Sequence, residues 1–400
     1  MITGPFNSSV QHARKPLENE LQRISAQCTE CRICVKQCGF LKQYGTPKKI
    51  AASCKPDDYK TLALAYACSL CSLCTAVCPE KIDPRRMFLA MRRYAVECGK
   101  GSFILQKKLL NFEKRGTSRQ YSFYGLPTGC DTVLFPGCAL AGSRPQRVLQ
   151  LFSHLQKSFP NLGIVFDCCT KPSHDLGRSG YFTAMFTEMR QYLASHGVKT
   201  VFVACPSCGA VFNQYGKEFT TRNVYEILAR EYWAPEALAH SVPVTIQDSC
   251  VARFDIHLHN SVRRIVRSRG VAVEEMFHHG KKTLCCGEGG GANFTAPQLA
   301  GKWAQMRKSE AGGKRIISYC AGCDLFLSKV APTAHLLDLL FDPITTLAGH
   351  ARASRSPFTY LNRLVLKWKF KRMMPYRFSR ERSFTANEMP DDRGGVDHAC

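Results

Sequence analysis

The sequence predicts an α/β protein with an α-helical N-terminal module followed by two tandem cysteine-rich α/β repeats. Three observations support this class: two runs of four closely spaced cysteines, strand-length apolar runs that alternate with helical segments, and two sparser cysteine sets that match each other. Strands that alternate with helices favour parallel sheets. The expected organisation is an N-terminal lead-in (1–27), a helical module (28–100), a linker (101–130), a first repeat (131–240), a second repeat (241–345) and a basic amphipathic tail (346–400).

The helical module is defined by two cysteine runs with the spacing C-x2-C-x2-C-x3-C. Four thiolates at such short steps are typical of a [4Fe–4S] cubane cluster, and where two runs occur together the fourth cysteine of each usually ligates the other run's cluster. Structural zinc also takes four thiolates, typically from two separated C-x2-C pairs, and is the weaker alternative. We therefore expect a dicluster, ferredoxin-like module with one cubane on Cys28, Cys31, Cys34 and Cys78 and a second on Cys68, Cys71, Cys74 and Cys38.

The amino-acid composition indicates in which cellular compartment the protein works and what kind of partner it binds. The chain has 22 cysteines and shows neither a secretory signal nor an apolar stretch of transmembrane length. Many cysteines without such a signal indicate metal ligation rather than disulfides, so we expect a reducing cytoplasm. The formal net charge of +24 favours an anionic partner, although the thiolates of bound clusters offset part of that charge.

The region after the linker has the periodicity of an α/β fold. Apolar, β-branched runs of strand length lie at 132–135, 164–166, 200–204, 244–247 and 315–318. Helical candidates separate them at 145–155, 181–196, 261–267 and 299–308. Cysteines follow the strand ends, and in an open α/β sheet the loops at that edge form the binding site.

These later cysteines form two matching sets of five. The first set is Cys138, Cys168, Cys169, Cys205 and Cys208, and the second is Cys250, Cys285, Cys286, Cys320 and Cys323. The first cysteines of the two sets are 112 residues apart, the pairs 117 and the closing C-x2-C motifs 115. Near-constant offsets indicate a duplicated module. A helical segment also follows each closing motif, at 224–228 and 336–340.

A duplicated C…CC…CxxC pattern behind a dicluster module resembles the cysteine-rich domains of the heterodisulfide reductase family. The layout is most similar to the D subunit, which fuses both parts in one chain. The C subunit of anaerobic glycerol-3-phosphate dehydrogenase and the iron–sulfur subunits of some lactate and glycolate oxidation systems are also similar. The resemblance covers roughly residues 25–340. In the heterodisulfide reductase family each complete set holds a noncubane [4Fe–4S] cluster, and the two clusters cleave a substrate disulfide.

The resemblance implies that both five-cysteine sets hold noncubane clusters and that all ten cysteines are catalytic. One departure separates the sets: Gly287 follows the second cysteine pair, whereas Thr170 follows the first. Threonine resists backbone conformations that glycine permits. A noncubane cluster in the second repeat alone is therefore an alternative, as is zinc or a simpler cluster. The run Gly289–Gly291 is expected to let its loop lie close to the cluster, and an anion-binding nest is the alternative. It is no P-loop, because the lysine and the serine/threonine terminus of that motif are missing.

Our leading hypothesis for function is an iron–sulfur oxidoreductase subunit that moves electrons between the cubanes and a thiol/disulfide-type substrate. A second hypothesis is an electron-transfer subunit that links a flavin dehydrogenase of the glycerol-3-phosphate, lactate or glycolate type to membrane quinone. A third is a non-enzymatic, metal-stabilised binding protein. Either redox hypothesis implies a flavoprotein or a membrane cytochrome/quinone subunit as partner, and both disfavour nucleic acid.

Several residues outside the four sets carry weaker expectations. Histidines that could donate protons to leaving thiolates are His174, His278, His279 and His335. Cysteines expected to be ordinary free thiols are Cys54, Cys98, Cys130 and Cys400.

The tail combines basic and apolar residues. On a helix, Phe358, Leu361, Val365 and Trp368 share one face, and Arg363, Lys367 and Lys371 share another. This pattern is typical of a helix at an anionic membrane surface, so the protein could be peripheral on the inner face of the cytoplasmic membrane. Docking to a membrane subunit or an acidic protein and a solvated tail are the alternatives.

Overall fold

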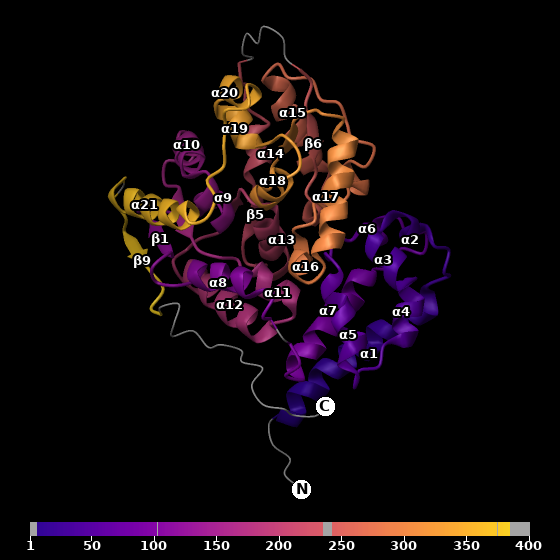
Figure 1. The fold of residues 1–400 in the computed structure, drawn as a ribbon. Helices are drawn as coiled ribbons and strands as arrows, with labels where there is room; N and C mark the ends of the chain where they lie inside the picture. Colours follow the sequence, from indigo (N-terminus) through magenta and orange to yellow (C-terminus); the bar gives the residue numbers. More distant parts are fainter. Residues whose placement is uncertain (1–5, 102, 235–241, 374, 385–400) are drawn as a thin grey trace.

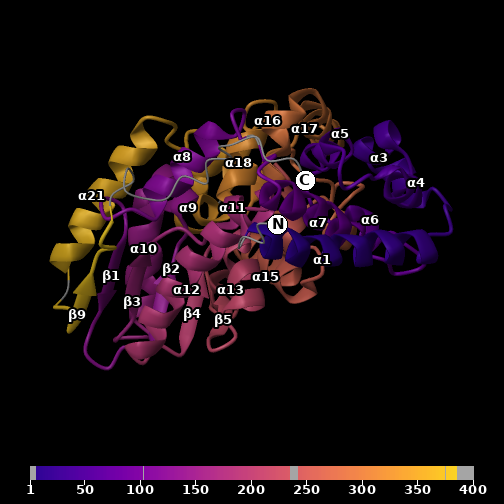
Figure 2. The same ribbon diagram turned by 90° about the horizontal axis from the view of Figure 1, so that it is seen from below.

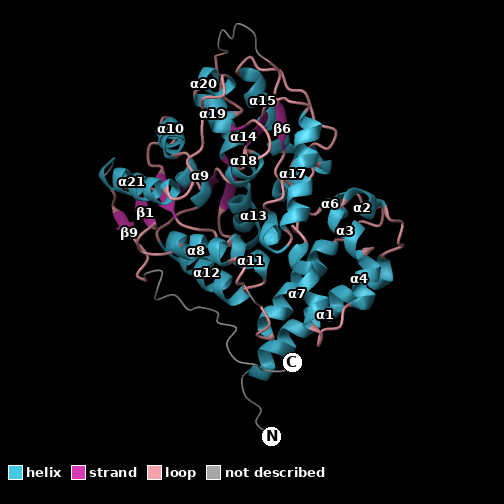
Figure 3. Cartoon of the chain, in the orientation of Figure 1, coloured by secondary structure: helices cyan, strands magenta, loops and turns pink. Residues whose placement is uncertain are grey.

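The computed structural model describes residues 6–101, 103–234, 242–373 and 375–384, and residues 6–10 by their backbone alone (Figure 1). Within these residues the chain has a helical N-terminal part followed by α/β structure with parallel strands, as the sequence predicts (Figure 3). No helix among the described residues is both long and apolar enough to cross a membrane.

The dicluster module consists of helices, most of them short because tight turns at the cysteines interrupt the chain. Its elements are α1 (Phe6–Gln27), α2 (Ile33–Gln37), α3 (Gly39–Tyr44), α4 (Pro47–Ser53), α5 (Tyr59–Ala63), η1 (Leu64–Ala67), α6 (Leu73–Ala76) and α7 (Pro84–Glu97). The side chain of Asp83 caps α7 by accepting from the Arg85 N–H at 3.1 Å, and Pro84 occupies the first turn. Leu17 and Ile24 of α1 are buried in one core with α7.

The first repeat is built on a six-stranded sheet in the order β5-β4-β2-β3-β1-β9, which Figure 2 shows edge to edge. The strands are β1 (Phe123–Leu126), β2 (Thr132–Phe135), β3 (Gly163–Phe166), β4 (Thr200–Val203), β5 (Thr220–Asn223) and β9 (Phe378–Arg380). Strands β2 to β5 pair in parallel, whereas β1 is antiparallel to both β3 and β9. The helices of this repeat are α9 (Cys138–Ser143), α10 (Pro145–Gln156), α11 (Lys171–Leu176), α12 (Ser179–Ser195), α13 (Pro206–Tyr215) and α14 (Val224–Leu228).

The second repeat has the same order of elements with fewer strands. Its parallel sheet is β6 (Thr245–Gln247), β7 (Ile316–Ser318) and β8 (Thr333–His335) in the order β6-β7-β8. The position of β3 is taken by a single parallel bridge between Val244 and Val273. The helices are η2 (Cys250–Ala252), α15 (Ile256–Ser268), η3 (Gly280–Lys282), η4 (Gly289–Gly291), α16 (Ala292–Thr295), α17 (Pro297–Ala311), α18 (Ala321–Leu327), α19 (Leu336–Phe341) and α20 (Pro343–Leu347).

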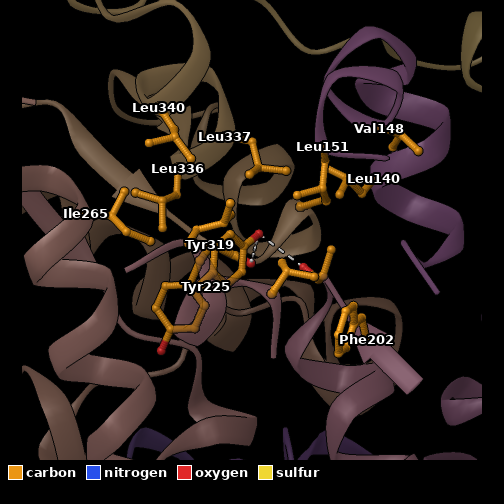
Figure 4. Packing of buried hydrophobic residues seen from close by; sticks show 14 of the residues in the cluster. Leu140, Val148, Leu151, Phe202, Tyr225, Ile265, Tyr319, Leu336, Leu337 and Leu340 are labelled. Atoms are coloured by element: carbon orange, nitrogen blue, oxygen red, sulfur yellow. Dashed lines mark hydrogen bonds between the residues drawn. The ribbon is translucent and has the colours of Figure 1, made fainter. Parts of the chain in front are cut away.

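One hydrophobic core joins the two repeats (Figure 4). Leu140 and Leu151 of the first repeat belong to the same buried cluster as Leu336 and Leu337 of the second. Tyr225 lies at the junction, where its hydroxyl donates to the Ala204 carbonyl at 3.1 Å and to the Tyr319 carbonyl at 3.4 Å. Because burial of apolar surface is the main stabilising contribution to a fold, the repeats form one unit.

Two segments contribute more to the first repeat than the sequence indicates. The segment expected to be a linker contains α8 (Lys107–Gly116) and β1, and β1 is an inner strand of the sheet. The segment expected to be a tail contains α21 (Phe358–Met373) and the edge strand β9. In α21 the buried face is formed by Leu366 and Phe370 together with two basic residues, Arg363 and Lys367. The Lys367 ammonium group donates to the carbonyls of residues 119 and 120 and pairs with a carboxylate, so burial leaves its charge compensated.

Candidate metal centres

The loops that carry the first eight cysteines share an uncommon backbone conformation. Glu30 and Arg32 in the first run have φ angles of 54° and 61°, and the equivalent Leu70 and Ser72 in the second have 52° and 57°. Residues other than glycine seldom adopt positive φ, since it costs about 1 kcal/mol or more at each position. These left-handed turns lie between consecutive cysteines and turn each loop inward.

The structure brings the two runs together across their fourth cysteines. One cavity is lined by Cys28, Cys31 and Cys34 with Cys78, and a second by Cys68, Cys71 and Cys74 with Cys38. Cys74 also reaches the wall of the first cavity, so the two sites are neighbours. This is the grouping that the exchange of fourth cysteines predicts, and ligation by these eight residues remains a prediction.

The thiol sets fit an iron–sulfur cluster by their chemistry. Burial, then the neighbouring thiols Cys28 and Cys31, raise the pKa of Cys34 to about 11. Burial and Cys71 likewise raise the pKa of Cys68 to about 12. Buried thiolates repel one another unless cationic iron compensates them, so each set calls for a positive centre. The described residues contain no His, Cys, Asp or Glu group arranged for a single metal ion.

The second five-cysteine set gathers at the carboxyl ends of β6 and β7. Cys250 lies in η2 after β6, and Cys320 caps α18 after β7, so the strands and the helix starts fix both positions. The loop before α16 brings in the adjacent pair Cys285 and Cys286. The Gly287 N–H donates to the Cys285 sulfur at 3.3 Å. Gly287 has φ 106°, and a Cβ there would lie 2.5 Å from the Ala300 carbonyl oxygen, so this position requires glycine.

The first five-cysteine set gathers in the same way. Cys138 begins α9 after β2, and Cys205 caps α13 after β4. The sulfurs of Cys208 and Cys169 are 3.4 Å apart, so the closing motif meets the adjacent pair. Thr170 adopts φ 53° at the corresponding position of the first repeat. Its hydroxyl is fully buried and has no hydrogen-bond partner among the described residues. The loop thus keeps a left-handed turn despite the β-branched side chain.

The second cubane site lies against the second repeat. A Cβ on Gly290 would lie 2.9 Å from the Ser69 carbonyl oxygen and 3.1 Å from that of Cys68, so only glycine allows this contact. The fully buried Arg92 donates to the carbonyls of Cys68 and Gly290, and at 2.6 Å to that of Asp175 in the first repeat. The glycine run therefore holds its loop close to the second cubane site, and its closeness to a bound cluster remains a prediction.

Glu288 lies between the two five-cysteine sets. Its carboxylate packs against Gly322, where a Cβ would be 2.8 Å from Oε2. Burial and the nearby Cys285 raise its pKa. The electrostatic influence of Glu288 also reaches Cys205 of the first set. The sequence pattern did not single out Glu288 from the glycine run that follows it, and its position directly after a cysteine pair was the available signal.

The candidate proton donors have ordinary structural roles. His335 is fully buried, its Nδ1 accepts from the Leu337 N–H at 3.2 Å to cap α19, and burial lowers its pKa to about 3. It is therefore uncharged near neutral pH, which corrects the expectation that it donates a proton. His174 is buried and bonded to the Tyr215 hydroxyl at 2.8 Å. His278 bonds to Gln37 at 2.9 Å, and His279 to the Met276 carbonyl at 2.8 Å.

The cysteines outside the sets divide into three cases. Cys54 and Cys130 are free thiols, as predicted. Cys98 is disulfide-bonded, so the prediction of a free thiol was wrong for it. Cys400 lies outside the described residues.

Comparison with known proteins supports the predicted order of domains. The family model of the 4Fe-4S dicluster domain matches residues 27–83, and that of the CCG cysteine-rich domain matches residues 132–213 and 244–328. The B subunit of fumarate reductase (CoM/CoB) from Methanothermobacter marburgensis is 24% identical over 369 residues, which cover 82% of this chain and 74% of that protein. EtfAB:quinone oxidoreductase from Syntrophomonas wolfei is 27% identical over 171 residues, or 40% of this chain and 24% of that protein. Lactate utilization protein B from Macrococcus caseolyticus is 34% identical over 124 residues, or 28% of this chain and 25% of that protein.

Proposed function

We infer that this chain is an iron–sulfur electron-transfer protein. It has a 4Fe-4S dicluster domain followed by two CCG cysteine-rich domains, and it is distantly homologous to the B subunit of CoM/CoB fumarate reductase. The dicluster domain implies two [4Fe–4S] clusters, and the homology indicates a subunit of a redox enzyme. We propose that it passes electrons between the cubanes and noncubane clusters in both repeats, and that these clusters reduce a thiol/disulfide-type substrate.

The observation that carries the proposal is the continuous order of the four thiol sets. The first cubane site shares Cys74 with the wall of the second. The second cubane site adjoins the second repeat, where Arg253 donates to the Cys71 carbonyl at 2.8 Å and a Cβ on Gly290 would lie 3.1 Å from the Cys68 carbonyl oxygen. Tyr225 joins the closing motifs of the two repeats, because its hydroxyl donates to the carbonyls of Ala204 and Tyr319, the residues before Cys205 and Cys320. The order is therefore first cubane, second cubane, second repeat and first repeat.

The chain's own residues would keep the four thiol sets next to one another and exclude water from them. When bound, the clusters supply one-electron carriers, and two adjacent centres could together provide the two electrons that a disulfide requires. Gly290 and Arg92 keep the second cubane loop against the second repeat. The ten repeat cysteines are buried or half-buried, so any substrate must reach them through the protein surface near one of the repeats.

Anaerobic metal analysis with electron paramagnetic resonance tests this proposal. Four clusters of four irons would give about sixteen irons per chain. The double variant Cys285→Ser/Cys286→Ser should lose about four irons and all disulfide reductase activity while the cubane signals remain. Cys54→Ser, outside every set, is the matched control and should change neither. Cubane signals alone, with no disulfide reduction by the purified protein, would favour the electron-transfer subunit that links a flavoprotein to quinone.

An exposed apolar stripe on α21 supports the proposal that the protein binds a membrane surface, whichever of the two redox functions it has. Phe358, Leu361, Val365 and Trp368 are 63%, 55%, 43% and 51% exposed, and the predicted shared face thus points to solvent. Exposed arginines flank it at positions 355, 372 and 377. Apolar residues with basic neighbours favour binding to anionic lipid.

Flotation with vesicles containing anionic lipid tests the stripe. Leu361→Glu/Trp368→Glu should abolish flotation, because it places charge in the lipid-facing surface. Phe277→Glu, at an 81% exposed position in the second repeat, is the control and should float like the unmodified protein. Equal flotation of all three proteins would exclude the stripe as the membrane contact, and no flotation of the unmodified protein would favour an acidic protein partner.

A further inference from the structure

The two five-cysteine sets differ in the source of their buried positive charge. In the second repeat, Arg253 follows Cys250 by three residues and is 1% exposed. Its Nε donates to the Cys71 carbonyl at 2.8 Å. At the offset that relates Cys138 to Cys250, the first repeat has Ala141, which carries no charge. A guanidinium group for the first repeat must therefore come from another part of the chain.

Helix α21 packs on α9 in a position from which one of its arginines can reach the first five-cysteine set. The Asn362 amide donates to the Gly142 carbonyl at 2.8 Å. A Cβ on Gly142 would lie 3.0 Å from the Thr359 carbonyl oxygen, so the absent side chain allows the two helices to approach closely. The next residue of α21, Arg363, lines a cavity together with Gly137 and Cys138 at the beginning of α9.

Arg363 faces the first five-cysteine set from inside the protein. It is 5% exposed, and its guanidinium lies over the rings of Phe112 and Tyr121, 5.2 Å and 4.8 Å from their centroids. It lines one small cavity together with Tyr121, Gly137, Cys138 and Asp167. A Cβ on Gly116 would lie 3.2 Å from Nη2 of Arg363 and 3.0 Å from the Cβ of Cys168. The guanidinium is therefore next to two of the five cysteines.

One nitrogen of this group is left without a partner. Nη1 of Arg363 is buried and makes no hydrogen bond to any described residue. The acidic residue of the same cavity, Asp167, is already paired with the fully buried Arg382, whose Nε donates to it at 2.7 Å. An uncompensated buried cation is costly, which points to an anionic group that the polypeptide does not supply.

Arg382 supports the same site from the other side. Asp167 accepts from Arg382 with one carboxylate oxygen, and with the other from the Cys168 N–H at 2.7 Å. Arg382 follows β9, the edge strand of the first-repeat sheet. Residues 358–373 and 375–382, which we term the C-terminal clasp, thus reach the first five-cysteine set through both of these arginines.

We propose that the C-terminal clasp completes the first-repeat centre and that Arg363 supplies the positive charge that an iron–sulfur cluster on Cys138, Cys168, Cys169, Cys205 and Cys208 requires. This inference rests on the proposed function, because it assumes that the set holds a cluster. Reduction adds one negative charge to such a centre, and a nearby cation stabilises the reduced form. Arg363 therefore raises the reduction potential of the first-repeat centre and leaves the cubanes unaffected.

A redox titration of the full-length protein, followed by electron paramagnetic resonance and combined with iron analysis, tests the proposal. Arg363→Gln should favour the oxidised first-repeat centre about tenfold, a shift of ~59 mV to lower potential for one electron. Arg363→Lys should keep the original potential, because it retains the charge without the planar guanidinium. Lys369→Gln, which removes an exposed charge from the same helix, should not shift the potential.

The outcomes distinguish a failure of the role of Arg363 from a failure of the proposed function. An unchanged potential and iron content in Arg363→Gln would overturn the role of Arg363, as would equal shifts in Arg363→Gln and Arg363→Lys. Loss of about four irons from Arg363→Gln with intact cubane signals would support it. If Arg363→Gln does not fold, Arg363→Lys decides, since a shifted potential in that folded variant would overturn the proposal. Unmodified protein without a first-repeat signal would overturn both this inference and the four-centre function.

Discussion

The two cysteine-rich repeats share a topology but differ in what supports them. In the second repeat, Asp248 lies two residues before Cys250. Its two carboxylate oxygens accept hydrogen bonds from Nη1 and Nη2 of Arg263 in α15, at 2.9 Å and 2.8 Å. In the first repeat, the carboxylate next to the cysteines is Asp167, and its partner Arg382 comes from the far end of the sequence. The dicluster module contacts both repeats, but the carboxylate beside the cysteines is held from within in the second repeat and by the C-terminal clasp in the first. Duplicated sequences can therefore keep one ligand pattern while their surroundings diverge.

The difference also suggests a division of roles. The second repeat contacts the second cubane loop through Gly290, so it is the nearer of the two to the electron carriers of the N-terminal module. The first repeat contacts the N-terminal module through α11 and is packed against α21 of the clasp. Four substitutions test whether the two repeats are supported in these different ways.

The largest effect is expected from Arg92→Ala, which removes the contact that both repeats share. Arg92 donates to carbonyls in the dicluster module and in both repeats, and its loss would leave these buried acceptors unsatisfied. We expect the free energy of unfolding to fall by about 4 kcal/mol, measured by urea denaturation. Arg86→Ala, at a 65% exposed position of the same helix, should change it by less than about 1 kcal/mol. Equal effects would mean that Arg92 does not join the domains.

Gly287→Ala should be the next largest change and should act on the second repeat alone. The new Cβ would meet the Ala300 carbonyl oxygen and the Phe326 ring, 2.5 Å and 2.7 Å away, at a φ of 106°. We expect a loss of about 3 kcal/mol in stability and a loss of iron from the second repeat. Gly301→Ala, with open space around it in α17, should be neutral or slightly stabilising. A fully loaded Gly287→Ala protein would contradict this account of the glycine.

Asp338→Asn should weaken the junction between the repeats by about 2 kcal/mol. Burial alone would raise the pKa of Asp338, but the Arg144 guanidinium lowers it, and Arg147 adds a hydrogen bond at 3.0 Å. A lowered pKa in the folded state means that this stability is present above the unfolded pKa of about 4 and is lost as the pH falls further. Urea denaturation from pH 6 to pH 3 should show a smaller acid-induced loss in Asp338→Asn. Identical pH profiles would rule out this contribution of Asp338.

The smallest effect is expected from Thr170→Gly, which makes the first repeat resemble the second. Glycine relieves the strained φ of 53° and removes an unpartnered buried hydroxyl, but it leaves a small void and a more flexible unfolded chain. We expect thermal denaturation to show a net change in stability within about 1 kcal/mol. A large gain in iron content would show that Thr170 limits cluster loading in the first repeat.

Much of the architecture could be predicted because it depends on local spacing and periodicity. The cysteine runs predict the dicluster domain, the constant offsets predict the duplication, and the strand-length runs predict the strands that begin at residues 132, 200 and 245. The short strand β1 in the expected linker, with the sequence Phe-Tyr-Gly-Leu, carries too few residues for a period to be recognised. The helix α21 was expected as an amphipathic helix, but which face would be buried was not indicated.

The amino-acid sequence alone establishes which residues can ligate metal, how many sets they form and that two of the sets arose by duplication. The order of the sets in space, the position of Glu288 between the repeats and the approach of Arg363 to Cys138 depend on tertiary packing. The two kinds of feature differ because ligand spacing is a local property of the chain. Charge compensation in a buried site is not a local property, because any segment of the chain that packs close enough can supply the compensating charge. In this protein the segment that does so lies more than two hundred residues from Cys138.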